Sequence, residues 1–225
     1  MFQNREEAGL LLAKRLDAYR QEQSALILAL PRGGVAVGYS LSLALRLPLD
    51  VFITRKLGAP DNPEYAIGAV TETGSVFLNP EARGVLDAVS FSSEALNKMI
   101  RAQQDEIARR QVLYRQGRPL PPLTKRTVLL VDDGIATGAT FLASAKALKG
   151  LGVQRLVGAI PVGPRDTLSL VRRQVDELVV LMTPEPLFAV GNYYIDFAQV
   201  EDAAVIRYLA AAASALRRSN LPSHA

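Results

Sequence analysis

The sequence predicts an α/β fold, with a mostly parallel central sheet that carries helices on both of its faces. Short apolar runs of strand length alternate along the chain with longer stretches of helical periodicity. Two of the apolar runs pass directly into Gly-containing turns and then into helical sequence, as buried parallel strands do in such a sheet. The 225 residues are enough for one α/β domain with a full core, or for one domain with a small appendage.

The first half of the chain opens with Asn4 and Glu7, whose spacing predicts a capping box at the start of a helix. A buried strand is expected where the sequence reads ALILAL, and a turn where PRGG follows it. Glu-Thr-Gly at 72–74 predicts a hairpin turn, and Ser93 is expected to cap a long helix. The expected elements are a helix at 4–20, a strand at 25–30, a helix at 35–45, a strand at 49–54, hairpin arms at 66–71 and 75–79, and a helix at 93–116.

The second half begins with a proline-rich stretch at 118–126 that leads into another strongly apolar run. Strands and helices then alternate until an irregular, aromatic-rich segment precedes the last helix. The expected elements are strands at 128–131, 155–162 and 177–182, helices at 141–151, 166–174 and 202–217, and the irregular segment at 183–199.

The stretch TVLLVDDGIATGAT, at 127–140, indicates a ligand site. Its strand ends in two adjacent acids, Asp132 and Asp133, and a loop of small residues separates them from a helix. Free backbone N–H groups and the positive end of the helix dipole favour a phosphate there. The two carboxylates would repel a second phosphate, but they could accept hydrogen bonds from a sugar diol or hold a divalent cation. A phosphorylated ribose satisfies both halves, whereas the simpler alternative is an ordinary strand–loop–helix turn with solvated acids.

The same order of groups resembles the signature with which type I phosphoribosyltransferases bind PRPP (5-phosphoribosyl 1-pyrophosphate): a hydrophobic strand, an acid pair, a small-residue loop and Thr-Gly-Ala-Thr. The resemblance implies that Asp132 and Asp133 bind the ribose 2- and 3-hydroxyls. It implies that the loop binds the 5-phosphate, through Gly134, Ile135, Ala136, Thr137, Gly138, Ala139 and Thr140. It also implies one Rossmann-like domain over 1–225, with a flexible-loop and helical insertion at 57–126 and a small hood-like segment at 183–200.

A second phosphate site is predicted at LPRGG, residues 30–34, where the first core strand meets a helix. A Gly pair at this place forms a backbone nest for anions, and Arg32 adds a fork of donors suited to phosphate oxygens. By position this turn resembles the family's pyrophosphate loop, which often holds a non-proline cis peptide. The resemblance implies that Arg32, Gly33 and Gly34 bind pyrophosphate and stabilise its charge as it leaves. The alternative is a tight turn with a surface Arg.

Other basic residues could also reach pyrophosphate. Arg55 and Lys56 end the second predicted strand at the same edge of the sheet, and we include Lys56 in the predicted pyrophosphate site; surface charge at a strand end is the alternative. The helix at 93–116 carries further candidates, although a solvated amphipathic face explains them more simply: Lys98, Arg101, Arg109 and Arg110.

Family members recognise their base with a variable hood, built partly from the carboxyl-terminal segment. The segment 184–199 resembles the purine-salvage pattern, so we expect Phe188 to stack on a planar base and Asp196 to contact a ring N–H or an exocyclic amine. The alternative is that its aromatic side chains only pack against the last helix: Phe188, Tyr193, Tyr194 and Phe197. Purine members commonly place an acid shortly after the ribose-binding pair, but positions 135–137 carry none here, which leaves the acceptor open.

The composition excludes several kinds of chemistry. The chain contains no Cys, and its one His, His224, lies in a polar tail, so thiolate catalysis and an internal His base are excluded. The net charge of +4 suits a polyanionic small molecule and does not by itself indicate nucleic acid. No apolar run approaches the roughly 18 residues of a membrane span, and early acids argue against an export signal, so we expect a cytoplasmic protein.

Together these features predict a pentosyltransferase of nucleotide salvage, in which a nitrogenous base displaces pyrophosphate from C1 of PRPP. The resemblance implies Asp132, Asp133 and Arg32 as catalytic residues and Mg²⁺ as cofactor, bound mainly through the ligand's oxygens and water. We expect a homodimer that binds neither nucleic acid nor membrane. One alternative is a PRPP-sensing regulator without turnover, although such proteins usually carry a nucleic-acid module and none is evident. The other is a nucleotide hydrolase, which would need a water-activating group near the phosphate loop.

Overall fold

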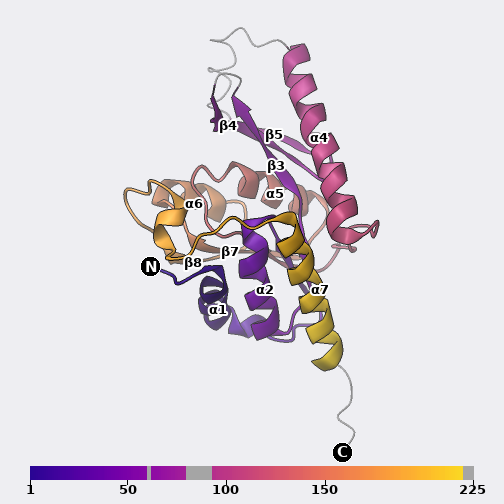
Figure 1. The fold of residues 1–225 in the computed structure, drawn as a ribbon, viewed down its shortest axis with the longest axis vertical. Coiled ribbons are helices and arrows are strands. Elements are labelled where there is room, and N and C mark those ends of the chain that lie inside the picture. The colour runs from indigo at the N-terminus through magenta and orange to yellow at the C-terminus, as the bar shows by residue number, and fades with distance from the viewer. Residues whose placement is uncertain (60–61, 80–92, 220–225) are drawn as a thin grey trace, which may run out of the picture.

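Five parallel strands form the central sheet, in the order β2-β1-β6-β7-β8 (Figure 1). The structure is a computed structural model that describes residues 1–59, 62–79 and 93–219. The strands of this sheet are β1 (Ala25–Ala29), β2 (Leu49–Val51), β6 (Thr127–Val131), β7 (Arg155–Val162) and β8 (Glu177–Met182). The parallel sheet confirms the fold class expected from the alternation of strands and helices.

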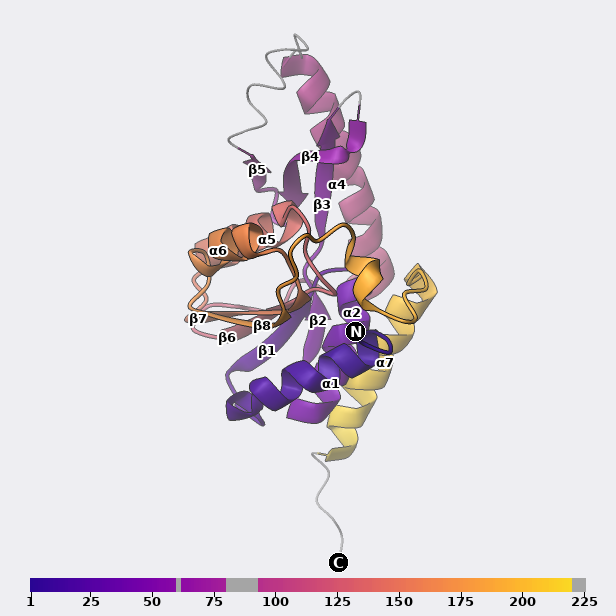
Figure 2. The same cartoon turned by 90° about the vertical axis from the view of Figure 1, so that its left-hand side faces the viewer.

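Helices cover both faces of this sheet (Figure 2). On one face α1 and α2 pack over side chains such as Ile27 and Leu129, and on the other α5 and α6 pack over Leu28 and Leu130. Every residue of β1 and β6 is buried because both faces are covered, which is why these strands read as continuous apolar runs. The helices are α1 (Arg5–Arg15), α2 (Gly33–Leu45), α5 (Ala139–Gly150), α6 (Arg165–Arg172) and α7 (Asp202–Ser219), with 3₁₀ turns η1 (Asp17–Tyr19) and η2 (Val190–Tyr193).

The first helix begins as its cap predicts. The side chain of Asn4 accepts a hydrogen bond from the Glu7 N–H at 2.9 Å, and the Glu7 carboxylate accepts one from the Gln3 N–H at 2.6 Å. The observed helix is shorter than the helix expected at 4–20, because α1 ends at Arg15 and the chain continues into η1. No helix in the described ranges is both long enough and apolar enough to cross a membrane.

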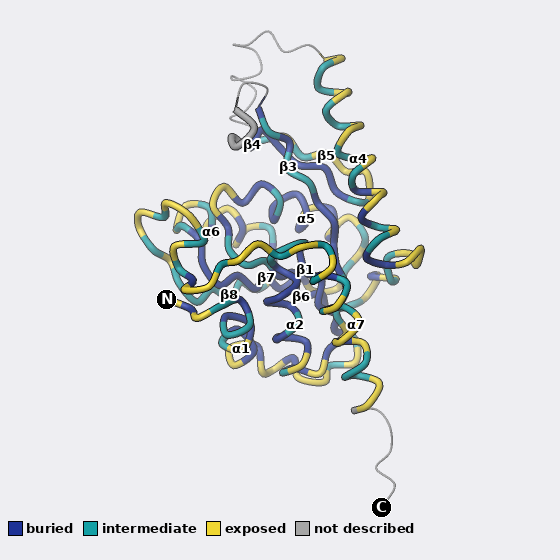
Figure 3. The backbone as a smooth tube through the Cα atoms, viewed as in Figure 1, coloured by how far each residue is buried: buried dark blue, intermediate teal, exposed yellow. Residues whose placement is uncertain are grey.

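A smaller antiparallel sheet, β3-β4-β5, lies beside the parallel one (Figure 1). Its strands are β3 (Thr54–Ala59), β4 (Asn62–Thr71) and β5 (Val76–Leu78), and α4 (Ser93–Arg115) runs along it. The carboxyl-terminal half of α4 is the buried half, as Figure 3 shows, and it packs Ile107 and Tyr114 into a cluster with Leu57 and Ile67. The predicted hairpin and long helix are therefore both present.

The expected strand at 49–54 is wrong, because the structure divides this run between the two sheets. β2 ends at Val51, the fully buried Phe52 and Ile53 make the crossing, and β3 begins at Thr54. Arg55 and Lys56 therefore lie near the start of β3, not at the end of the second parallel strand. A continuous apolar run does not distinguish one strand from two strands that share a buried junction.

Arg115 fastens the end of α4 to both sheets. Its guanidinium donates to the Asp50 carboxylate at 3.0 Å and to Glu72 Oε1 at 2.9 Å, and it also donates to the Val51 carbonyl. The side chains of Arg115 and Glu72 are only 3% and 2% exposed. Burial raises the pKa of Asp50, and the nearby Arg115 opposes that rise. This buried network fixes the position of α4 over the molecule.

Candidate active site

The candidate site lies at the carboxyl ends of β1 and β6, where the order in which the chain adds strands to the parallel sheet reverses. From β1 the chain crosses to β2 on one side, and from β6 it crosses to β7 on the other. Turns that leave two adjacent strands in opposite directions open a crevice between them, where ligands bind in this class of sheet. The register pairs Ala29 with Val131, so the turn at 30–34 and the loop at 132–140 start side by side. The structure thus brings the two predicted phosphate sites together.

Gly33 and Gly34 are where the two turns touch. A Cβ on Gly33 would lie 1.9 Å from Oδ2 of Asp133, and one on Gly34 would lie 2.9 Å from the Val131 carbonyl oxygen. Only glycine leaves room for this approach. The Pro31–Arg32 peptide is cis, as the resemblance implied. Neither Gly33 nor Gly34 has an acceptor for its N–H among the described residues, so both N–H groups are unpaired at this end of the sheet.

The loop before α5 also offers free donors. Within the described chain the backbone N–H groups of 136–140 have no acceptor, and Ala136 and Thr137 are exposed. Gly138 has a left-handed backbone with φ 70°, and a Cβ there would meet the Thr167 side chain at 2.6 Å. These free N–H groups at a helix start have the geometry of an anion site.

Ile135 differs from the rest of the loop. Its side chain is 3% exposed and packs into the core, and its N–H donates to the Val162 carbonyl at 2.9 Å. Because that donor is already used, Ile135 anchors the loop to β7 instead of presenting an N–H to a ligand. A sequence pattern does not distinguish this inward residue from its neighbours.

The acid pair is half-buried between the two turns. Oδ1 of Asp132 accepts a hydrogen bond from the Asp133 N–H at 2.9 Å. Burial, followed by the neighbouring charge of Asp133, raises the pKa of Asp132 well above its ordinary value, while Arg5 acts in the opposite direction. The pair therefore lies in a place where a hydroxyl donor or a cation would be stabilised.

Arg5, in the first turn of α1, reaches this pair from outside both turns. Its Nε lies 2.7 Å from Oδ2 of Asp133, and its Nη1 donates to the Ala198 carbonyl at 2.9 Å. Its guanidinium carbon lies 3.8 Å from the centre of the Phe197 ring. Residues 128 positions apart in sequence thus meet at the acid pair.

The predicted hood-like segment, 183–200, packs on the same spot. The Tyr194 hydroxyl donates to the Asp133 carbonyl at 2.5 Å, and its ring stacks on Phe197 with centroids 5.0 Å apart. These two rings therefore pack at the acid pair, not only against the last helix. Phe188 is 82% exposed, and Asp196 is exposed, with its Oδ1 accepting from the Ala198 N–H at 3.0 Å. Both predicted base contacts therefore lie on the surface of the described structure.

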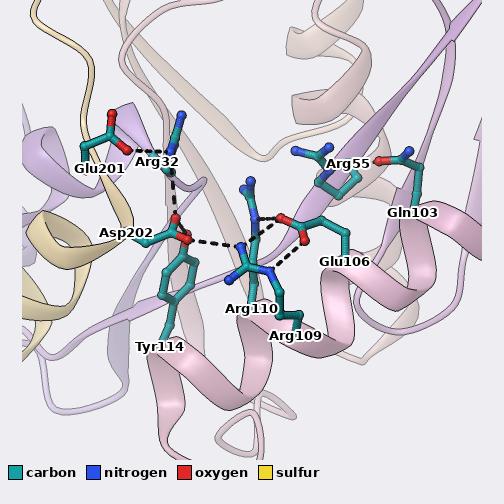
Figure 4. Close-up of polar contacts among 9 residues, drawn as sticks. All are labelled: Arg32, Arg55, Gln103, Glu106, Arg109, Arg110, Tyr114, Glu201 and Asp202. Carbon is teal, nitrogen blue, oxygen red and sulfur yellow. Dashed lines mark hydrogen bonds and ion pairs between the residues drawn. The ribbon is translucent and has the colours of Figure 1, made fainter.

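Three arginines converge on the outer side of the turn at 30–34. Figure 4 shows the guanidinium groups of Arg32, Arg110 and Arg55 between that turn and β3. Arg55 donates to Gln103 at 2.9 Å, and Arg110 donates to Glu106 at 2.7 Å. Burial lowers the pKa of Arg55, and the positive charges of Arg110 and Arg32 lower it further. This concentration of positive charge would be relieved by an anion.

Asp202, in the first turn of α7, lies beside this arginine cluster (Figure 4). It accepts from the Tyr114 hydroxyl at 2.6 Å and from Arg109 at 3.0 Å, and it lies 3.9 Å from Arg32. Arg32 also donates to Glu201 at 3.2 Å. Arg109 thus belongs to a clasp between α4 and α7, whereas Arg110 belongs to the cluster.

The remaining predicted basic residues lie elsewhere. Lys98 and Arg101 are exposed along the outer part of α4. Lys56 is half-buried in β3, and because successive strand residues point to opposite faces, it faces away from Arg55. His224 lies outside the described residues.

Comparison with known sequences identifies the family. The family described as "Phosphoribosyl transferase domain" matches residues 4–182, a range that contains both turns, the acid pair and Arg5. The chain belongs to the phosphoribosyl transferase family.

Two relatives of this chain extend the comparison. The chain is 40% identical over 209 residues to a Mycobacterium tuberculosis protein, found in strains CDC 1551 and H37Rv, whose provisional description is phosphoribosyl transferase. That match covers 93% of this chain but 46% of the relative, so the chain spans about half the length of the curated relatives it matches. The crystal structure of TT1426 from Thermus thermophilus is 37% identical, covers 92% of this chain and 97% of that one, and superposes with a TM-score of 0.74.

Sequence reasoning missed Arg5. The available signal was a basic residue directly after a helix cap, where acids are the usual choice because of the helix dipole. Its partner could not be read from the sequence, since only the fold brings α1 to the loop after β6.

Proposed function

We propose that this protein moves the 5-phosphoribosyl group of PRPP to a nitrogenous base and releases pyrophosphate. The observation that carries the proposal is the pair of N–H nests, at Gly33–Gly34 and at 136–140, with two carboxylates between them. PRPP has the matching order of groups: one phosphate at C5, a diol in the middle and pyrophosphate at C1. A simple sugar phosphate would leave one nest without a partner.

The loop before α5 would hold the 5-phosphate. Its free N–H groups would donate to the phosphate oxygens, and the side chains of Thr137 and Thr140 would add two hydroxyl donors. Asp132 and Asp133 would accept hydrogen bonds from the ribose hydroxyls. The diol would thereby be fixed, so that C1 points toward the turn at 30–34. The residues with free N–H groups are Ala136, Thr137, Gly138, Ala139 and Thr140.

That turn would hold the pyrophosphate. The N–H groups of Gly33 and Gly34 and the guanidinium of Arg32 would bind its oxygens, with Arg110 and Arg55 adding positive charge. When the C1–oxygen bond breaks, the electron pair leaves on pyrophosphate, and these donors would stabilise the added charge. Lys56 faces away from Arg55 on β3, so its part in pyrophosphate binding stays a prediction.

Magnesium fits this site as a partner of the ligand. Among the described residues no group of three or more His, Cys, Asp or Glu side chains is arranged to hold a metal, and Oδ2 of Asp133 is already paired with Arg5. A Mg²⁺ ion would therefore be held mainly by phosphate oxygens and water, with Asp132 as the available carboxylate. When bound, it would neutralise part of the pyrophosphate charge.

The acceptor half of the site is less defined. The exposed Phe188 could stack on a base, and Asp196 could accept from a ring N–H. Transfer to a preformed base would place the reaction in nucleotide salvage. Positions 135–137 offer one buried and two exposed side chains without an acid or a base, and this favours a second candidate function, PRPP binding without turnover. The homodimer and the cytoplasmic location stay predictions.

Calorimetric titration with PRPP and Mg²⁺, followed by a pyrophosphate-release assay across a panel of bases, tests both candidates. Turnover on a base supports the transferase, and tight binding without turnover on any base supports the second candidate. Replacing both acids, Asp132→Asn and Asp133→Asn, should weaken PRPP binding by about tenfold or more, because each charged hydrogen bond contributes roughly 1.5–3 kcal/mol. Asp17→Asn, on the exposed η1 turn, is the matched control. Unchanged PRPP affinity in the double variant would contradict the assignment.

A further inference from the structure

Arg5 makes more directed contacts at the acid pair than a structural ion pair would need. One guanidinium contacts the Asp133 carboxylate, the Ala198 carbonyl and the face of the Phe197 ring. The side chain of Arg5 is 9% exposed and that of Asp133 is 16% exposed. An arginine held on three sides in this way has almost no rotational freedom, and it passes that restriction to the carboxylate it binds.

The contact also determines which oxygen of Asp133 is available. Nε of Arg5 binds Oδ2, whereas no N–H group of the described residues donates to Oδ1, and the carboxyl group of Asp132 lies beside that of Asp133. Oδ2 is also the atom that a Cβ on Gly33 would meet at 1.9 Å, and that Cβ would lie 3.1 Å from Nε of Arg5. The oxygen on the crowded side is therefore already satisfied, and the other remains for a ligand.

The backbone of Asp133 is held as well. The Tyr194 hydroxyl donates to the Asp133 carbonyl at 2.5 Å. Tyr194 also stacks on the Phe197 ring whose face contacts the Arg5 guanidinium. Carboxylate and carbonyl are thus fixed by one continuous cluster of Arg5, Tyr194 and Phe197. This cluster joins α1 to the hood-like segment at the acid pair.

We propose that Arg5 is a positioning residue for ribose: it holds Asp133 so that the free oxygen Oδ1 meets a ribose hydroxyl of PRPP. The inference rests on the proposed function, since it assumes that Asp133 binds the ribose diol. Arg5 itself touches no reacting atom. It acts on the ribose half of the ligand and not on the pyrophosphate half, which the donors at Arg32–Gly34 would bind.

The test compares three ligands by calorimetry: PRPP, ribose 5-phosphate and pyrophosphate. Arg5→Gln should weaken ribose 5-phosphate and PRPP by about tenfold, the equivalent of one lost charged hydrogen bond, and should leave pyrophosphate affinity unchanged. Arg5→Lys keeps the positive charge, but a lysine ammonium lacks the planar guanidinium that reaches both Asp133 and Ala198. We therefore expect a smaller loss of affinity in this variant, again only for ribose 5-phosphate and PRPP. Should Arg5→Gln fail to fold, Arg5→Lys carries the same comparison.

A double-mutant cycle separates this role from a general structural one. If Arg5 acts through Asp133, then adding Arg5→Gln to Asp133→Asn should cost no further ribose affinity. Arg155→Gln, which breaks an exposed ion pair with Glu177, is the matched control and should change none of the three affinities. Parallel losses for pyrophosphate and ribose 5-phosphate, or additive losses in the cycle, would overturn the inference. Absence of PRPP binding in the unmodified chain would instead overturn the proposed function.

Discussion

Gly33 lies against Asp133 so closely that a Cβ on the glycine would be 1.9 Å from the carboxylate oxygen Oδ2. The proposed pyrophosphate turn and the proposed ribose site are therefore one packed unit. A change in the backbone of either turn must move the other. This relationship makes the glycine, which carries no functional group, a sensitive probe of the site.

Gly33→Ala should push the Asp133 carboxylate away from its place beside Arg5. We expect PRPP affinity to fall by about tenfold or more, and the free energy of unfolding to fall by about 1–3 kcal/mol from overpacking. Titration calorimetry and urea unfolding measure the two effects. Gly150→Ala is the control, because a Cβ at Gly150 would meet nothing within 4 Å. A Gly33→Ala variant that binds PRPP as tightly as the unmodified chain would show that the acids and the turn do not share a ligand.

Arg110 and Arg109 are neighbours on α4 that share Glu106 but otherwise lie beside different groups, which allows a paired test. Arg110 lies in the cluster with Arg32 and Arg55, whereas Arg109 pairs with Glu106 and Asp202 at the clasp. Arg110→Gln should weaken pyrophosphate binding by about tenfold, as the loss of a charged donor does, with little change for ribose 5-phosphate. Arg109→Gln should have the smaller effect. Equal losses in the two variants would mean that the cluster is not the pyrophosphate site.

Arg115→Gln tests the support of α4, not ligand binding. The change would leave the buried Glu72 carboxylate without its main partner, and breaking such a pair costs about 3–5 kcal/mol of unfolding free energy. Urea unfolding followed by circular dichroism measures the loss. Adding Glu72→Gln should restore part of it, because the uncompensated charge is then removed. A stable single variant would show that water reaches Glu72 and replaces the guanidinium.

The sequence predicted the two turns that meet at the candidate site because the signals for them are local. The apolar runs before PRGG and before the acid pair are fully buried strands, and buried parallel strands bring their carboxyl ends to one edge. What it could not predict depends on contacts between distant segments. Arg5 meets Asp133 only through the packing of α1, Ile135 turns inward only because β7 lies beside it, and the run at 49–54 divides only because a second sheet exists.

The ion pairs of Glu106 with Arg109 and Arg110 should give the stability of the protein a dependence on pH. The hydrogen bond from Arg109, assisted by that from Arg110, lowers the pKa of Glu106 from 4.5 to about 2. A carboxylate whose pKa is lower in the folded state contributes stability that is fully present above its unfolded pKa and is lost as the pH falls through the folded one. Glu106→Gln should therefore be less stable than the unmodified chain above pH 4.5, and the difference should shrink between pH 4.5 and about 2.

Urea midpoints measured at several pH values across this range test the expectation. Arg109→Gln should narrow the pH range over which stability is lost, because it removes the largest cause of the lowered pKa of Glu106. A stability difference that stays constant from neutral pH down to about pH 2 would show that the ionisation of Glu106 is not coupled to folding.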